Sequence, residues 1–103
     1  MGDAWHSAST GFVEICYRKL RGVVYVKVID IYCGTGRDIT WHGNLLPEGY
    51  RPSADAEPYF PVGHMDNSGN SGMCKINSTG AIGGIGPKAD IYYGGYVSYP
   101  AEN

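Results

Sequence analysis

The chain has 103 residues, the size of one ordinary domain, and no second domain is expected. Charged residues make up only 17% of the sequence and the formal net charge is −2, so the composition indicates no basic surface for nucleic acid. Gly (16 residues) and Tyr (9 residues) are in excess, which is typical of many turns and of an uncharged, hydrogen-bonding surface.

The first residues of the chain carry little structural signal. Residues 1–11 are small and polar apart from Trp5 and His6, and they are predicted to form a flexible lead-in to a single domain over residues 12–103. They also lack the basic-then-apolar order of a signal peptide, and no run in the chain approaches the ~18 apolar residues of a membrane span. Membrane insertion is therefore not expected.

A β-hairpin is the clearest secondary-structure signal. Residues 12–17 and 23–32 are dense in β-branched and aromatic residues, and a short segment ending in Gly22 separates them. In the second strand, alternation predicts one face for the core, carrying Val24, Val26 and Val28. It predicts the opposite face for Tyr25, Lys27, Ile29 and Ile31.

A proline-rich connector follows in the middle of the chain. Residues 45–61 hold four of the six prolines and cannot be helical, because each proline fixes its own φ and lacks an N–H. The segment is predicted to be rigid and extended. Gly49 is expected to adopt a backbone conformation that other residues resist, and Tyr50 and Tyr59 to pack the connector against the domain.

Five further strands are predicted around this connector, over residues 39–42, 59–64, 73–77, 81–85 and 91–100. Proline within the second of them favours an edge strand or a bulge. The third and fourth form a hairpin whose Gly80 suits a positive φ, and the last is predicted to bend or bulge at Gly94 and Gly95. These signals predict an all-β fold, a small antiparallel β-sandwich or jelly-roll-like barrel of about seven strands with little or no helix.

The three cysteines give no sign of a metal site. Cys16, Cys33 and Cys74 are odd in number and have no C-x-x-C spacing, which argues against a disulfide framework and against zinc. Buried free thiols are the favoured interpretation, and neither a metal nor a cofactor is predicted.

No catalytic motif is present, so the chain is predicted not to be an enzyme. The three histidines are scattered, and there is no nucleophile elbow, H-E-x-x-H or Walker pattern. A glycosidase pair could be drawn from the loop acids Asp55, Glu57, Asp66 and Asp90. Solvated loop charges are the favoured interpretation of these residues.

Aromatic and polar side chains are the candidates for ligand contact: Trp41, His42, His64, Asp66, Tyr92 and Tyr93, with Tyr96 as a further candidate. Aromatic rings stack on the apolar C–H faces of sugars, while Asp and His bond to sugar hydroxyls. Other interpretations stay open. Trp41 could belong to the core, the last-strand tyrosines could pack against another subunit, and His64 with Asp66 could join a metal site between symmetric copies.

The order of the Gly and Pro punctuation resembles one protein family over nearly the whole chain. Residues 46–53 read LPEGYRPS, residues 60–61 read FP, residues 76–82 read INSTGAI and residues 97–100 read VSYP. This order is similar to the C-terminal domain of tail fibre, baseplate and receptor-binding proteins from phages and prophages of Gram-positive bacteria.

The resemblance implies a receptor-binding module at the tip of a phage or prophage tail, at the host cell surface. Its implied ligand is a bacterial cell-surface saccharide, and its implied partners are two further copies in a homotrimer and the rest of the tail fibre or baseplate. It would be made in the bacterial cytoplasm without a signal peptide of its own. The alternative is a structural domain that trimerises or caps the fibre and contacts only protein.

Overall fold

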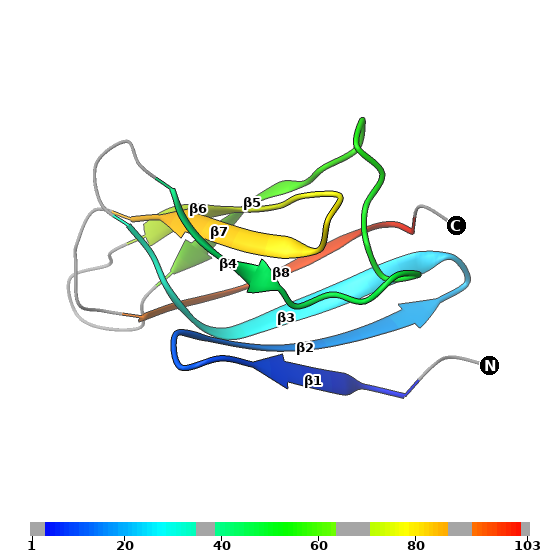
Figure 1. The fold of residues 1–103 in the computed structure, drawn as a ribbon, viewed down its shortest axis with the longest axis horizontal. Coiled ribbons are helices and arrows are strands. Elements are labelled where there is room, and N and C mark those ends of the chain that lie inside the picture. The colour runs from blue at the N-terminus through cyan, green and yellow to red at the C-terminus, as the bar shows by residue number, and fades with distance from the viewer. Residues whose placement is uncertain (1–3, 35–38, 64–70, 87–91, 102–103) are drawn as a thin grey trace.

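The computed structural model describes residues 4–34, 39–63, 71–86 and 92–101, and within them every regular element is a β-strand (Figure 1). The strands are β1 (His6–Ser9), β2 (Val13–Leu20), β3 (Val23–Tyr32), β4 (Thr40–Asn44), β5 (Tyr59–Gly63), β6 (Ser71–Ile76), β7 (Ala81–Ile85) and β8 (Tyr92–Pro100). The all-β prediction is confirmed.

The eight strands form one antiparallel sheet in the order β1-β2-β3-β8-β5-β6-β7-β4. The sheet curls into a half-barrel, so that β1, β2, β3 and β8 face β5, β6, β7 and β4 across the core (Figure 1). β8 is the strand that connects the two halves, because it pairs with β3 on one side and with β5 on the other.

Strand β1 lies inside the segment that was predicted to be a flexible lead-in. His6 pairs with Tyr17 and Ser9 with Glu14, which adds a fourth strand to the first half of the sheet. The sequence gives little sign of it, because an edge strand with both sides near solvent can be polar throughout. Three of the four residues of β1 are exposed.

Alternation along β2 and β3 fills the first half of the core. Val24 and Val26 are fully buried and Val28 is 2% exposed, as predicted. The largest fully buried side chains come from both halves of the sheet and from the connector: Tyr93, Ile15, Ile31, Leu46, Ile76 and Ile82. One continuous core therefore lies between the two halves.

A β-bulge interrupts this alternation. The register of β3 with β8 shifts between Val28 and Ile31, and Ile31 is fully buried while Ile29 and Asp30 are both exposed. The prediction that Ile31 shares the face of Ile29 was therefore wrong, because an inserted residue reverses the faces that follow it. A bend or bulge was predicted in β8 at Gly94 and Gly95. The structure has the bulge at this level of the sheet, but the inserted residue is in the neighbouring strand β3.

The connector between β4 and β5 lies across the end of the half-barrel, and side chains of the sheet donate hydrogen bonds to its main-chain carbonyls. Lys19 Nζ donates to the carbonyl of Gly49 at 2.9 Å, and Tyr99 Oη donates to the carbonyl of Tyr50 at 2.6 Å. Gly49 has φ of 90°, as predicted. Tyr50 packs against the core, whereas Tyr59 does not cover the connector, since 64% of its surface is exposed.

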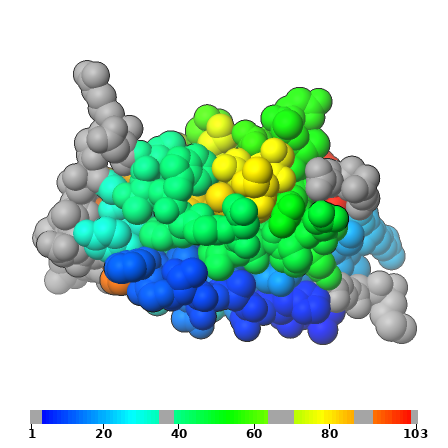
Figure 2. Space-filling model, in the orientation of Figure 1, coloured from blue at the N-terminus to red at the C-terminus, as the bar shows by residue number. Residues whose placement is uncertain are grey.

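In Figure 2 the connector and β4, both in green, cover the side of the molecule that faces the viewer, with β1 in blue below them. Strand β5 contains Pro61 yet lies inside the sheet order rather than at an edge. It tolerates the proline because it pairs with β8 only at Val62 and Gly63, so no ladder bond to β8 needs the missing N–H.

Candidate functional site

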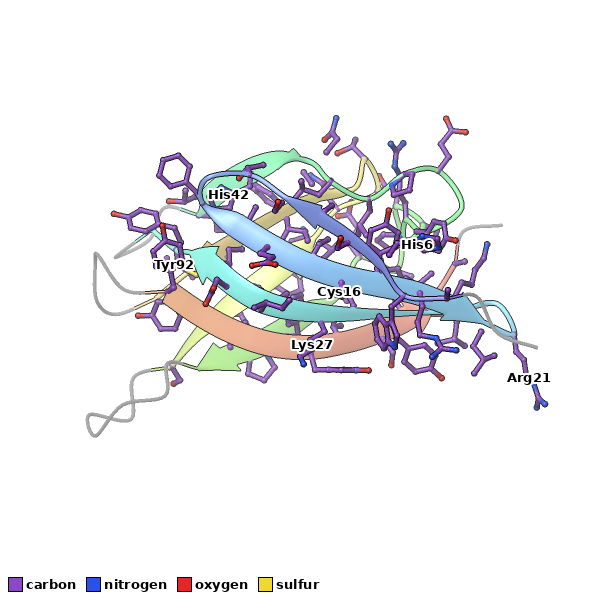
Figure 3. All side chains as sticks on the ribbon, turned by 90° about the horizontal axis from the view of Figure 1, so that it is seen from below. His6, Cys16, Arg21, Lys27, His42 and Tyr92 are labelled. Carbon is purple, nitrogen blue, oxygen red and sulfur yellow. The ribbon has the colours of Figure 1, made fainter. Side chains whose placement is uncertain are left out.

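The structure separates the residues that were predicted to contact a ligand. His42 and Tyr92 lie at the same end of the molecule (Figure 3), and Trp41 lies on the outer face of the second half of the sheet. Tyr93 lies in the core. His64 and Asp66 fall outside the described residues.

The ring of Trp41 lies against a glycine of the neighbouring strand. Trp41 pairs with Gly83, and a Cβ added to Gly83 would come within 2.6 Å of the Trp41 ring and of Ile39. Trp41 keeps 43% of its surface exposed, so it is not a core residue. Its ring and Ile39 instead form part of an apolar outer surface.

His42 is occupied by contacts within the chain. Its Nε2 lies 2.8 Å from the carbonyl oxygen of Tyr32, and because a carbonyl only accepts, that nitrogen carries the proton. Its ring stacks with Phe12 at 6.3 Å between centroids, and Phe12 also contacts Tyr32 at 6.1 Å. His42 therefore joins the end of β3 to β4.

Tyr93 cannot contact a ligand at the surface, because it is buried in the core. None of its surface is exposed, and a Cβ added to Gly86 would lie 2.6 Å from its ring. The ring occupies the space that a side chain at Gly86 would take. Tyr93 is thus a packing residue of the core, while Tyr92, one position earlier, points outward.

A concave surface, here called the outer groove, lies on the outer face of the first half of the sheet. It has a volume of about 730 Å³ and is lined by residues 27–30 of β3, by Gly63 of β5, and by Tyr92, Gly94, Gly95 and Tyr96 of β8. Figure 3 looks onto this face, with Lys27 near the middle and Tyr92 at one end.

Glycines and the bulge create this groove. Tyr92, Gly94 and Tyr96 share the outer face of β8, so a position without a side chain lies between two exposed tyrosines. A Cβ on Gly94 would lie 3.1 Å from the carbonyl oxygens of Val28 and Ile29, which is tighter than an ordinary contact. The bulge brings this backbone close and turns Ile29 and Asp30 outward beside the gap.

Two charged side chains border the apolar floor of the groove. Lys27 is paired with Tyr96 across the strands, and Asp30 is paired with Glu14. Among the described residues neither Lys27 nor Asp30 forms an ion pair, so a cation and a carboxylate are available to hydroxyl groups of a ligand. The groove thus combines two aromatic rings with one donor and one acceptor.

Sequence reasoning identified Tyr92 and Tyr96 but missed the other lining residues. The sequence pattern places Lys27 and Ile29 only on the non-core face of a regular strand, and it predicts no role for Asp30. The paired glycines at 94 and 95 were the available signal, since glycine within a strand often marks a close backbone approach.

The loop acids considered for catalysis have structural partners where they are described. Glu57 accepts a hydrogen bond from the backbone N–H of Ser78 at 2.7 Å and lies 3.3 Å from Lys75 Nζ. The hydrogen bond from the Ser78 N–H and, to a smaller extent, the positive charge of Lys75 lower the pKa of Glu57 below its ordinary value. Asp55 accepts from Ser53 Oγ at 2.8 Å. Asp66 and Asp90 fall outside the described residues.

The described residues contain neither a metal-binding cluster nor a membrane-spanning helix. No group of three or more His, Cys, Asp or Glu side chains there is placed to hold a metal ion. No helix in that part of the chain is long and apolar enough to cross a membrane.

No protein-family model, curated protein or solved structure matches the chain. Its function is therefore inferred from the outer groove and from the residue pattern.

Proposed function

We propose that this chain is a non-catalytic saccharide-binding module. The observation that carries the proposal is the outer groove, in which Tyr92 and Tyr96 flank the side-chain-free position at Gly94. Sugar rings present apolar C–H faces that pack on aromatic rings, and their hydroxyls bond to groups such as Lys27 and Asp30. A shallow open groove of this kind suits a flat and hydroxylated ligand.

The proposal extends to a biological setting, a receptor-binding module of a phage or prophage tail tip that recognises a bacterial cell-surface glycan. This part rests on the ordered motifs at residues 46–53, 60–61, 76–82 and 97–100. In the fold these motifs form the connector, part of β5, the β6–β7 turn and the end of β8. The connector bonds to both halves of the sheet, because the Tyr50 carbonyl accepts from Tyr99 Oη and the Leu46 N–H donates to the Gly80 carbonyl. These contacts support a scaffold role for the motifs, with binding carried by loops and outer faces.

A non-catalytic role is supported by the carboxylates around the groove. Asp30 is the one carboxylate among the described residues that line the groove, and Glu14, which opposes it on β2, lies outside the lining. Glycosidases instead use two carboxylates that face each other across the bound sugar, about 5–10 Å apart. Incubation with host wall polysaccharide is expected to release no reducing sugars. Release that is lost in Asp30→Asn would contradict this.

Substitution of the groove tyrosines tests binding. Tyr92→Ala and Tyr96→Ala are each expected to weaken binding to host wall glycans by about tenfold, because each removes one stacking ring. Tyr59→Ala is the matched control, since Tyr59 is 64% exposed on the second half of the sheet and does not line the groove. Glycan arrays and isothermal titration give the affinities. Equal losses in all three variants would contradict binding at the groove.

A second candidate function, assembly of a fibre through protein contacts alone, is favoured by a different surface. The outer face of β4, β7, β6 and β5 exposes apolar side chains: Ile39 at 36%, Trp41 at 43% and Met73 at 45%. Apolar surface of this kind often marks a protein interface. If Trp41→Ala lowered the mass in light scattering while glycan binding was unchanged or absent, assembly would be the favoured function.

A further inference from the structure

A second, smaller pocket adjoins the outer groove. It has a volume of about 200 Å³ and is lined by Trp5, Arg18, Leu20, Tyr25 and Tyr96. Tyr96 lines both hollows, so its ring lies between them. A ligand that covers Tyr96 can therefore extend from the groove into the pocket.

Arg18 is the charged residue of this pocket, and among the described residues its guanidinium has no acidic partner. Its Cζ lies 5.4 Å from the centroid of the Trp5 ring, which holds the planar group by a cation–π contact. Its Nε is buried without a hydrogen-bond acceptor among the described residues, where Arg18 also forms no ion pair. A buried donor left without an acceptor is costly, so an acid group that enters the pocket and draws the guanidinium toward it would relieve that cost.

Lys27 adds a second positive charge on the same face. The register pairs Arg18 with Tyr25 and Lys27 with Cys16, so Arg18 and Lys27 are diagonal neighbours on adjacent strands. Lys27 is also paired with Tyr96 on the other side. The acids of this face, Glu14 and Asp30, oppose each other further along the strands, which leaves the two cations grouped around Tyr96.

We propose that Arg18 and Lys27 form a subsite for the acidic group, carboxylate or phosphate, of a saccharide whose adjacent ring stacks on Tyr96. This inference rests on the proposed function and narrows its ligand to acidic glycans. Arginine suits the task because its planar donor fork binds two oxygens of one acid group at once. Trp5 holds the fork in place before the ligand arrives, which lowers the entropy lost on binding.

Nuclear magnetic resonance of the full-length, ¹⁵N-labelled chain tests the subsite directly. The Arg18 Nε–H signal is followed during titration with sodium glucuronate and with inorganic phosphate, and with glucose and sodium chloride as controls at equal ionic strength. A saturable shift with glucuronate, with phosphate or with both is expected, and the arm that responds identifies the acid. No saturable shift with either acid, or an equal shift with chloride, would overturn the subsite.

Charge variants give the second measurement. Arg18→Gln is expected to weaken binding of the responding acid by at least about tenfold, since charge-assisted hydrogen bonds are lost. Arg21→Gln makes the same chemical change on an exposed turn at the tip of the β2–β3 hairpin, and affinity is expected to stay within about twofold (Figure 3). Equal losses in both variants would show a general charge effect and overturn the subsite.

The two proposals fail separately. If neutral glycans bind at Tyr92 and Tyr96 while Arg18 responds to neither acid, the subsite is wrong and the saccharide-binding function stands. If Arg18 binds acids saturably but no glycan of any kind shifts the groove tyrosines, the subsite stands as an anion site and the saccharide-binding function is wrong.

Discussion

A Cβ placed on Gly84 would lie 2.7 Å from Cys33 Sγ and 2.8 Å from Cys74 Sγ. Both sulfur atoms are buried, and they approach Gly84 of β7 from opposite sides. Cys74 of β6 pairs with Gly84 on one side, and Gly34, the residue after Cys33, donates its N–H to the Gly84 carbonyl on the other. The glycine thus provides the space in which the two thiols meet.

Gly84→Ala is expected to destabilise the protein by roughly 1–3 kcal/mol, since overpacking a filled core displaces its side chains. Chemical denaturation gives the change in the free energy of unfolding. Gly43→Ala is the control, because a Cβ there has no atom within 4 Å. Adding Cys74→Ala to Gly84→Ala should recover part of the loss, and an equal effect of the two single alanine variants would contradict this account.

Burial also predicts how the thiols react. The hydrogen bond with Cys33 and burial raise the pKa of the Cys74 thiol above its ordinary value, which removes the reactive thiolate at neutral pH. Cys33 is only 1% exposed, whereas Cys16 is half-buried on the outer face of β2. Ellman's reagent is expected to label Cys16 quickly and the other two only after denaturation.

Cys16→Ser should remove the fast reaction and leave the slow one unchanged. Fast labelling of all three thiols in the folded protein would show that the core around Gly84 opens readily. In the structure, the prediction of buried free thiols holds for Cys33 and Cys74, whereas Cys16 is only half-buried.

At the scale of elements, Glu57 ties the connector to the β6–β7 turn. Its carboxylate accepts from the N–H of Ser78, and the turn itself is closed by Asn77, whose side chain accepts from the N–H groups of Thr79 and Ala81 at 3.1 Å each. Gly80 completes the turn with φ of 86°. A Cβ there would also lie 2.4 Å from the carbonyl oxygen of Leu46, so only glycine fits.

The charge on Glu57 predicts a stability that depends on pH. Its pKa is lower in the folded protein than in the unfolded chain, so its contribution is fully present above the unfolded value of about 4.3 and is lost as the pH falls through the folded value. Glu57→Gln is expected to lower the Tm at pH 7, and the difference should narrow below about pH 4.3.

Thermal unfolding followed by circular dichroism between pH 3 and pH 7 measures this difference. Glu48→Gln is the control, an exposed carboxylate in the same connector. A gap between the Glu57 variant and the parent that stays constant over the whole pH range would rule out the charge of Glu57 as its cause.

The elements that the sequence predicted are those whose signal is local. Val24, Val26 and Val28 alternate within one strand, and the β6–β7 turn is marked by Gly80, so both were readable without a structure. The bulge at Ile29 was not, because it depends on how β8 and β2 approach β3 from both sides. Strand β1 was missed because its polar residues pair only at a sheet edge.

The same distinction applies to the candidate site. Tyr92 and Tyr96 stand out as exposed aromatics in a strand, but the sequence does not show that Tyr93 between them is fully buried under Gly86. Arg18 stands out in the sequence only as part of a basic cluster with Lys19 and Arg21 at a hairpin end, because its contact with Trp5 arises from the pairing of β1 with β2. Binding surfaces built across strands depend on register, which short sequence patterns do not fix.

At the scale of the whole molecule, the fold depends on its last strand. β8 pairs with β3 from Val23 to Tyr32 and with β5 at Val62 and Gly63, so among the named strands of the described residues it is the one that pairs with both halves. The bridge between Gly34 and Ile85 is a shorter link between the halves. β8 also supplies Tyr93, Val97 and Tyr99 to the core. Without β8, the first half would keep a three-stranded sheet and the second half would lose its hydrogen-bonded neighbour.

A chain that ends at residue 86 is therefore expected not to fold. The two remaining half-sheets would each expose the core face that now packs against the other, and small open sheets are marginal in water. Circular dichroism should show no cooperative thermal transition.

Adding a synthetic peptide of residues 87–103 to the truncated chain should restore the cooperative transition, because the missing strand can insert between two open edges and recover main-chain hydrogen bonds. A peptide in which Tyr93 and Val97 are replaced by Ser keeps the backbone but loses core contacts, and it is expected to restore nothing. If the truncated chain unfolded cooperatively by itself, one half of the sheet would be a folding unit and β8 would serve the binding surface alone.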